Sequence, residues 1–295
     1  MRPLYTWKLR SRSLGLGART LIMGVVNVTP DSFSDAGQHF DHRKAIEHGL
    51  HMLDSGADLI DLGGESTRPG VEVAERTAVP EPEELRRVVP VLEGILRARP
   101  QAIISVDTYK ADVARVALDI GAEIINDVSG GQWDRDMIRT LAELECGLVL
   151  MHTRGRPHEW RSQPKSLDIV DEVRHDLANI VQSATGAGIA KERLVLDPGF
   201  GFGKMGDENY SLLAHFGALH ELGYPLLTGV SRKGFIGATL AASGKATDCP
   251  PPERLYGTLA AVTACILGGV HIVRVHDVRA VRDAAQVADA VLQAR

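Results

Sequence analysis

The chain has 295 residues, of which 44% are hydrophobic and 24% are charged, and its formal net charge is −5. These values are typical of a soluble globular protein, and the net charge excludes the strongly basic surface with which proteins bind nucleic acid. No stretch approaches the roughly 18 consecutive apolar residues that cross a membrane. Three cysteines without CxxC spacing favour the reducing cytoplasm and argue against a disulfide framework or a zinc site.

Eight apolar runs of strand length follow one another along the chain, and each ends on a glycine or a polar residue. In chain order, these ends are Val25–Asn27, Leu59–Gly63, Ile104–Asp107, Ile124–Asn126, Val149–His152, Leu194–Asp197, Leu226–Gly229 and Ile272–His276. Short continuous apolar runs are typical of buried parallel strands. Because α/β enzymes collect ligand-binding groups at the C-terminal ends of such strands, the pattern predicts one pocket to which many strands contribute.

Amphipathic stretches with helical spacing separate these runs. Start signals such as Pro82-Glu83-Glu84 delimit them, because proline and acidic residues favour the first turn of a helix. The predicted helices span 41–53, 82–95, 109–120, 134–145, 168–187, 207–222, 253–268 and 277–294. Strict alternation of strands and helices, without a break in composition, favours one closed (β/α)8 barrel over a two-domain doubly wound sheet.

The prediction is a single barrel domain over residues 1–295, in which residues 1–20 form an N-terminal hairpin or extension over the barrel floor. Three predicted loops, at 28–40, 63–81 and 152–167, are longer than usual connections. All three follow the C-terminal end of a strand. We therefore expect them to lie over the active face as binding loops or lids.

The segment Asp197-Pro198-Gly199-Phe200-Gly201-Phe202-Gly203-Lys204 follows the sixth predicted strand. Its glycines allow the backbone to approach a ligand closely, and its two aromatic rings are suited to covering a flat ring. The alternative is a flexible loop whose aspartate only caps the next helix.

Cationic residues follow several strands. Arg68, on the glycine-flanked loop 63–70, has the planar fork that suits phosphate or carboxylate, although an isolated loop arginine is often simply solvated. Ser231-Arg232-Lys233 follows the seventh strand, and Arg274 and His276 end the eighth with side chains on one face. Since the loops after strands seven and eight often bind phosphate in barrels, we predict a phosphate or diphosphate site there.

Four further polar residues, Asn27, Asp107, Asn126 and Asp197, are predicted to ring the barrel mouth. Buried amides and carboxylates are costly unless a ligand or a mutual network satisfies them. This mixture of donors and acceptors suits a heterocycle, and internal hydrogen bonding at the strand ends is the alternative.

Three charged residues after the fifth strand, His152, Arg154 and Arg156, are interpreted as solvated loop charges. The chain has no legible nucleophilic triad, no dinucleotide-binding fingerprint after the first strand and no strong metal-ligand spacing. Catalysis by positioning and by stabilisation of a leaving group is therefore predicted.

The segment 23–35, Met-Gly-Val-Val-Asn-Val-Thr-Pro-Asp-Ser-Phe-Ser-Asp, resembles the first signature of dihydropteroate synthases, and 63–70 resembles their second. The match continues in family order through segments 105–108, 125–128, 197–204, 231–233 and 274–278. The resemblance implies a (β/α)8 barrel that joins 4-aminobenzoate to 6-hydroxymethyl-7,8-dihydropterin diphosphate and releases pyrophosphate. It also implies a Mg²⁺ cofactor, competition by sulfonamides, a homodimer and a place in folate synthesis.

The resemblance further implies roles for individual residues. The catalytic residues would be Arg68, Lys233, Asp107 and Asp197. The pterin would be bound by Asp107, Asn126, Val128, Met151, Asp197, Gly229 and Lys233. The diphosphate would be bound by Asn27, Arg68, Arg274 and His276, with Asn27 also near Mg²⁺. The 4-aminobenzoate pocket would be formed by Thr67, Pro69, Phe202, Ser231 and Lys233.

The sequence departs from the family pattern in three places. Gly234-Phe235 stands where a small polar residue and an aliphatic are expected, Asp35-Ala36-Gly37 replaces the usual Asp-Gly-Gly, and the loop from Glu75 to Pro82 is slightly extended. Two rival functions remain open. A pterin-binding methyltransferase domain shares the barrel, but it has no need of cations around a diphosphate. A non-catalytic pterin-binding scaffold is expected to have lost some of these polar residues.

Overall fold

A computed structural model describes residues 2–29, 42–65, 79–242 and 248–294. Most of the two loops predicted at 28–40 and 63–81 lies outside these ranges. In the described segments, no helix has the length and apolar character needed to cross a membrane.

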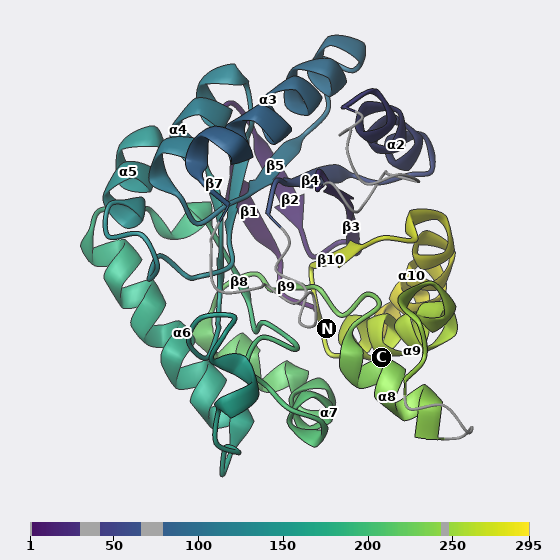
Figure 1. The fold of residues 1–295 in the computed structure, drawn as a ribbon. Helices are drawn as coiled ribbons and strands as arrows, with labels where there is room; N and C mark the ends of the chain where they lie inside the picture. The colour runs from purple at the N-terminus through teal and green to yellow at the C-terminus, as the bar shows by residue number, and fades with distance from the viewer. Residues whose placement is uncertain (1, 30–41, 66–78, 243–247, 295) are drawn as a thin grey trace.

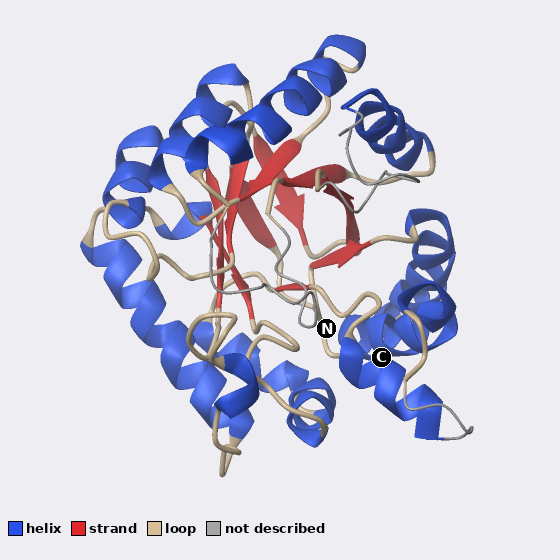
Figure 2. Cartoon of the chain, in the orientation of Figure 1, coloured by secondary structure: helices blue, strands red, loops and turns tan. Residues whose placement is uncertain are grey.

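Eight parallel strands form the centre of the molecule (Figures 1 and 2). They are β3 (Leu21–Asn27), β4 (Leu59–Gly63), β5 (Ile104–Asp107), β6 (Ile124–Asp127), β7 (Gly147–Met151), β8 (Leu194–Asp197), β9 (Leu227–Thr228) and β10 (Ile272–Val275). Their spatial order is β8-β7-β6-β5-β4-β3-β10-β9. A parallel bridge between Leu196 and Leu226 joins the two ends of this series. The predicted (β/α)8 barrel is therefore confirmed.

Helices surround the barrel and cover the outer faces of its strands (Figure 2). They are α2 (His42–Asp54), α3 (Glu81–Ala98), α4 (Ala111–Ile120), α5 (Met137–Leu144), α6 (Ile169–Gly186), α7 (Asp207–Ala214), α8 (Gly234–Ala242), α9 (Leu255–Leu267) and α10 (Val278–Gln293). Short 3-10 helices η1 to η4 span Trp160–Ser162, Lys191–Arg193, Phe216–Leu222 and Pro251–Arg254. The start of helix α6 has a local cause: the Asp168 side chain caps the first turn by accepting hydrogen bonds from the backbone N–H groups of Val170 and Asp171.

Two helix predictions differ from the structure. The predicted helix at 207–222 is α7 followed by η3, in which the buried Phe216 and Leu219 are three residues apart, the period of a 3-10 helix. Helix α8 was not predicted. Its sequence, Gly-Phe-Ile-Gly-Ala-Thr-Leu-Ala-Ala, is apolar around the whole circumference, so it lacks the one-sided period by which a helix is recognised.

The N-terminal hairpin closes the barrel floor. Strands β1 (Tyr5–Lys8) and β2 (Ser13–Leu16) pair antiparallel within residues 4–20, where a hairpin was expected. Trp7 is 0% exposed and packs in one cluster with the floor residues of the barrel, and its indole Nε1 donates to the carbonyl of Arg193 at 2.8 Å. The hairpin thus packs an apolar cluster against the N-terminal end of the barrel.

Replacing Trp7 with alanine is expected to lower the free energy of unfolding by about 3–5 kcal/mol, because it removes a buried ring and leaves a cavity. Leu167→Ala is the control: this large apolar side chain is fully exposed, and its loss is expected to cost less than about 0.5 kcal/mol. Urea denaturation measures both. Equal losses for the two variants would contradict the role of Trp7 in the floor.

Candidate active site

Because side chains alternate between the two faces of a strand, the polar residues near the strand ends point into the mouth of the barrel. Leu59, Ile124, Val149, Val195, Leu227 and Ile272 belong to the floor cluster inside the barrel. Because successive side chains of a strand point to opposite faces, the residue two positions further on each strand also faces the interior. These residues are Asp61, Asn126, Met151, Asp197, Gly229 and Arg274. Five of the six are predicted site residues, and Asp61 is the exception.

A buried ionic network occupies the centre of the mouth. Arg274 donates from Nε to Asp61 Oδ2 at 2.6 Å and from Nη2 to Asp107 Oδ2 at 2.8 Å. Asn126 Nδ2 donates to the same Asp61 oxygen at 3.0 Å. Burial raises the pKa of Asp107, and the charge of Arg274 opposes that shift. The two carboxylates in turn raise the pKa of Arg274 against the effect of its burial.

Asn27 faces the same centre from the end of β3. A Cβ atom placed on Gly63 would lie 3.7 Å from Asp107 Oδ2 and 3.8 Å from Asn27 Oδ1. Both oxygens therefore lie beside this glycine, at the end of β4. The two oxygens come from the strands on either side of β4, and amide and carboxylate oxygens are ligands of the kind that Mg²⁺ prefers.

Asp197 and the loop that follows it form the wall opposite. Asp197 Oδ1 accepts the backbone N–H of Gly199 at 2.7 Å. Burial raises the pKa of Asp197 to about 6, a shift that the bond from Gly199 and the charge of Lys233 oppose. Gly199 has φ +66°, and a Cβ there would lie 1.9 Å from the carbonyl oxygen of His152. Only glycine fits this turn.

Lys233 lies between this loop and the ionic network. Its Nζ is 3.9 Å from the centre of the Phe202 ring, a cation–π distance. Burial lowers the pKa of Lys233 to about 7, although Asp197 opposes the shift by favouring the charged form. An ammonium over an aromatic ring and near a carboxylate forms one polar corner of the mouth.

An apolar cluster lines another side of the mouth. It comprises Val128, Met151, Trp160 and Phe202. Trp160 and Phe202 meet edge to face with ring centres 5.0 Å apart. Met151 ends β7, and Val128 and Phe202 lie in the segments that follow β6 and β8. All three are predicted site residues, and the fold brings them together.

The loops after β9 and β10 are joined to each other. Ser231 Oγ shares a hydrogen bond of 2.9 Å with His276 Nδ1 and accepts the backbone N–H of His276 at 3.3 Å. Arg232 forms a two-pronged ion pair with Asp277, at 2.9 and 2.6 Å, and its φ is +57°. Arg232 therefore supports the loop, while Ser231, Lys233 and His276 face the mouth. The stem of Arg274 lies against Gly229, where a Cβ would be 3.9 Å away.

Comparison with known proteins identifies the family of this chain. A model of the pterin binding enzyme family matches residues 23–276. The dihydropteroate synthase of Escherichia coli (strain K12) is 43% identical over 274 residues, which cover 93% of this chain and 92% of that protein. The chain belongs to the dihydropteroate synthase family. The Mycobacterium leprae dihydropteroate synthase is 45% identical, with coverage of 92% and 94%.

Solved structures of dihydropteroate synthases agree with this chain in fold. A structure of the Xanthomonas albilineans enzyme with 4-aminobenzoic acid has a TM-score of 0.87 and 43% identity, and covers 99% of this chain and 100% of that one. A second structure of that enzyme, in complex with 7,8-dihydropteroate, has a TM-score of 0.84 and 41% identity and covers 98% and 99%. A Yersinia pestis dihydropteroate synthase with a sulfonamide drug complex has a TM-score of 0.87, 39% identity and coverage of 98% and 100%. The chain is thus a transferase of the dihydropteroate synthase family.

The predicted site residues divide into two groups. The structure gathers Asn27, Asp107, Asn126, Val128, Met151, Asp197, Phe202, Gly229, Ser231, Lys233, Arg274 and His276 around one barrel mouth. Thr67, Arg68 and Pro69 lie outside the described residues. The preceding Glu65 accepts hydrogen bonds from Tyr109 and, at 2.6 Å, from Lys110.

The interpretation of residues 152–156 as solvated loop charges is wrong for two of them. His152 is buried, and its Nε2 lies 3.1 Å from Asp176 Oδ2. Burial lowers the pKa of His152 to about 4. The Arg154 side chain is 9% exposed and pairs with Glu172 at 2.7 Å. Arg154 also supports the loop 199–204, because its Nη1 donates to the Gly203 carbonyl at 3.2 Å.

Two residues of the site were missed by sequence reasoning. Lys204 is buried, donates from Nζ to the Gly199 carbonyl at 2.8 Å, and has its pKa lowered by burial to about 7. Asp61 binds both Asn126 and Arg274. A signal for Asp61 existed: it stands two residues after Leu59 on a strand whose odd-numbered residues face inward.

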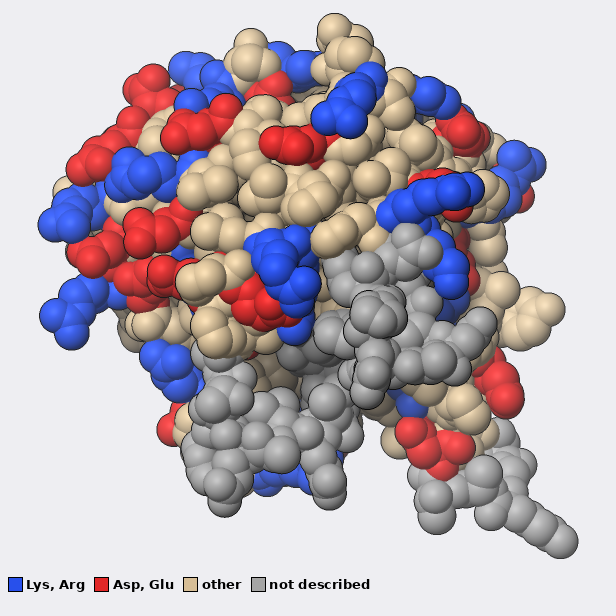
Figure 3. Space-filling view, turned by 45° about the horizontal axis from the view of Figure 1, so that its top comes forward, with Lys and Arg blue, Asp and Glu red and all other residues tan. Residues whose placement is uncertain are grey.

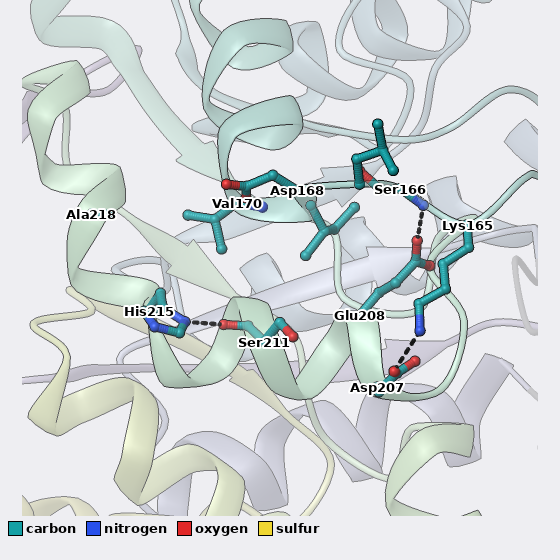
Figure 4. A pocket seen from close by; sticks show the side chains of 11 residues that line it. Lys165, Ser166, Asp168, Val170, Asp207, Glu208, Ser211, His215 and Ala218 are labelled. Atoms are coloured by element: carbon teal, nitrogen blue, oxygen red, sulfur yellow. Dashed lines mark hydrogen bonds and ion pairs between the residues drawn. The ribbon is translucent and has the colours of Figure 1, made fainter.

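A cavity of about 460 Å³ lies on the outside of the barrel, between the start of α6 and α7. Figure 4 shows that its charged groups bind one another: Lys165 pairs with Asp207 at 2.7 Å, and Glu208 accepts the backbone N–H of Ser166 at 2.7 Å. None of the lining residues is a strand-end residue. On the face in Figure 3, positive and negative side chains are interspersed. The strand ends, and not this outer cavity, hold the converging polar groups.

Replacing Gly199 with alanine is expected to destabilise the protein by more than about 2 kcal/mol, because the new Cβ clashes with the carbonyl of His152 in addition to the strain of a positive φ. Gly188→Ala is the matched control, since Gly188 has φ +96° and no atom within 4 Å of its Cβ position. This variant therefore measures only the cost of placing alanine at a positive φ, which is about 1 kcal/mol. If thermal or urea unfolding gave the same loss of stability for both variants, the proposed steric clash at position 199 would be wrong.

Proposed function

We propose that this chain condenses 6-hydroxymethyl-7,8-dihydropterin diphosphate with 4-aminobenzoate to form 7,8-dihydropteroate and pyrophosphate. The observation that carries this proposal is the joint presence, at one barrel mouth, of Asp197 and Asn126 beside the cations Lys233 and Arg274. Family membership and the ligands of the Xanthomonas albilineans structures, 4-aminobenzoic acid and 7,8-dihydropteroate, support it.

On the pterin side, the proposed contacts are acceptors for the amino and ring N–H groups of the heterocycle. Asp197 accepts only one protein hydrogen bond in the described segments, from Gly199, which leaves acceptor capacity on its carboxylate. Asn126 and Asp107 complete the polar edge, and Lys233 is a donor for the ring carbonyl. Val128 and Met151 supply the apolar surface for the ring face, and Gly229 keeps room beside the Arg274 stem.

On the diphosphate side, Arg274 and His276 are the proposed binding residues, joined by Arg68 from the segment outside the described residues. Guanidinium groups suit the paired oxygens of a diphosphate. Asn27 is the proposed protein ligand of Mg²⁺, because its amide Oδ1 lies beside Gly63 at the barrel mouth and Mg²⁺ prefers oxygen ligands. Bound Mg²⁺ would neutralise charge on the departing diphosphate.

On the arylamine side, Phe202, Ser231 and Lys233 are proposed to form the 4-aminobenzoate pocket, together with Thr67 and Pro69. Phe202 offers a ring for stacking, and the Lys233 ammonium lies over that ring. Ser231 is held by its bond to His276, which links the arylamine pocket to the diphosphate side. Both substrates thus meet at Lys233.

The proposed mechanism begins with the leaving group. An arylamine is a weak nucleophile, so the carbon that it attacks must be activated before the attack. The bond between the pterin methylene carbon and the diphosphate oxygen therefore breaks first, and its electron pair leaves with the diphosphate. Cations stabilise that charge as it develops, and the electron-rich dihydropterin shares the positive charge on carbon. The amine nitrogen then attacks this carbon and releases one proton.

Three rival functions predict different behaviour. A methyltransferase domain has no use for Lys233, Arg274 and His276 beside one another, and a scaffold would bind pterin without turnover. A hydrolase would release pyrophosphate without any arylamine. Turnover assays therefore separate all three from a synthase.

With Mg²⁺, dihydropterin diphosphate and 4-aminobenzoate, pyrophosphate release is expected to depend on the arylamine and to stop when a chelator removes Mg²⁺. Asp197→Ala and Lys233→Ala are each expected to reduce the rate below about a tenth of wild type, because each removes a charge-assisted contact. Circular dichroism checks that the barrel remains folded. Asp207→Ala, at a side chain 72% exposed on the outer surface, is the control that retains full rate.

Binding of dihydropterin diphosphate is expected to be accompanied by uptake of protons from solution. The pKa of Lys233 is about 7, so this side chain is mostly neutral at about pH 8, and a bound anion favours its charged form. Calorimetry in two buffers of different ionisation enthalpy should therefore show uptake of up to about one proton. Lys233→Arg is the matched variant, because arginine stays charged. Unchanged uptake in that variant would assign the proton to another group.

A homodimer in the cytoplasm is a further proposal from the family resemblance. Exposed Tyr210, Leu240 and Tyr256 on the neighbouring helices α7, α8 and α9 support a contact surface there. Sedimentation velocity of the full chain measures the oligomeric state.

A further inference from the structure

Asp61 lies inside the barrel on β4, between the apolar floor and the polar mouth. It is 0% exposed. Its carboxylate contacts one residue proposed for the pterin, Asn126, and one proposed for the diphosphate, Arg274. The same buried group thus touches both halves of the proposed binding site.

The carboxylate decides how the amide of Asn126 is oriented. Asp61 Oδ2 lies 3.0 Å from Asn126 Nδ2. An ionised carboxylate has only acceptors, so the amide must turn its NH₂ group toward Asp61. The Asn126 oxygen then faces away from Asp61 and remains an acceptor for a ring N–H donor. Without Asp61, either end of this amide could face a ligand.

The same carboxylate also fixes Arg274. A guanidinium has five N–H donors. One, on Nε, is bound by Asp61 at 2.6 Å, and one, on Nη2, is bound by Asp107 at 2.8 Å. The other three have no hydrogen-bond partner among residues 2–29, 42–65, 79–242 and 248–294. Two carboxylates therefore hold the planar group while leaving donors for an anion.

The environment of Asp61 argues against a purely structural role. Its Oδ1 is buried and has no hydrogen-bond partner among the described residues, and the same holds for the hydroxyl of Ser105, which pairs with Asp61 in the register of β4 and β5. An unsatisfied buried carboxylate oxygen destabilises a fold. A carboxylate here therefore has a reason beyond stability.

We infer that Asp61 is a positioning residue: it turns the oxygen of Asn126 toward the pterin and holds Arg274 with its unused donors toward the diphosphate. The inference rests on the proposed function, since it assigns an orienting role within that site. Asp61 itself need not touch the substrate.

The test compares Asp61→Ala with Asp61→Asn in the full chain. Both variants remove the same charge, so the difference between them reports the hydrogen bonds alone. The asparagine oxygen can take the place of Oδ2 and accept both bonds, whereas alanine offers no acceptor. Calorimetry measures the Kd of two probes separately: 6-hydroxymethylpterin for the pterin half and inorganic pyrophosphate for the other. For both probes, Asp61→Ala is expected to bind at least about tenfold more weakly than Asp61→Asn.

The matched control is a buried carboxylate that pairs with an arginine elsewhere in the fold. Asp289 is 9% exposed and accepts from Arg2 at 2.8 Å and from the backbone N–H of Thr20 at 2.7 Å. It lies on α10, away from the strand ends that form the mouth. Asp289→Ala and Asp289→Asn are expected to lower Tm and to leave both Kd values unchanged.

Each outcome decides the matter. Kd values for Asp61→Ala and Asp61→Asn that agree within about threefold would overturn the inference. If Asp61→Ala does not fold, Asp61→Leu fills the space and gives the same comparison; failure of both to fold, while Asp289→Ala folds, would make Asp61 structural and also overturn it. Wild-type protein that bound neither probe would instead refute the proposed function.

Discussion

The guanidinium of Arg274 lies between the carboxylates of Asp61 and Asp107, and the polar mouth of the barrel depends on this arrangement. Carboxylates buried inside a barrel are costly unless an opposite charge and hydrogen bonds compensate them. Arg274 supplies both, and Asn126 adds a further donor to Asp61. Because two partners hold the guanidinium, its remaining donors have a fixed direction before any ligand arrives. Preorganised charge of this kind is what a departing diphosphate requires, since no reorganisation is then needed as the bond breaks.

The two ends of the barrel have separate tasks. At the N-terminal end, Trp7 and the hairpin that carries it close the interior with apolar side chains. At the C-terminal end, the same strands carry carboxylates, amides and cations. The change takes place over two residues of each strand, as from Ile272 to Arg274. The packed floor stabilises the fold, so that the mouth can contain groups that reduce stability for the sake of binding.

The loop after β8 shows how much support the site requires from residues that touch no substrate. Gly199 has a positive φ and no room for a side chain, and the ammonium of buried Lys204 binds its carbonyl. Arg154 binds the Gly203 carbonyl from behind. Asp197 and Phe202 are therefore held in place from both sides of the loop. Arg232 has the equivalent task between Ser231 and Lys233, where its ion pair with Asp277 stabilises a left-handed backbone.

The sequence by itself determined the barrel architecture, because apolar runs and amphipathic stretches show which residues are buried. It also determined which strand ends carry polar groups. The helix at Gly234–Ala242 escaped, since a segment that is apolar on all sides has no period to read. Motifs marked Arg274 and Asn126, but not the carboxylate that joins them, because Asp61 and Arg274 are 213 residues apart in the chain. Likewise, His152 and Arg154 were interpreted as solvated charges, but in the fold they pack against Asp176 and Glu172. Only the tertiary structure decided these pairings, since partners in a buried network are set by strand register and closure of the barrel, which no local pattern encodes.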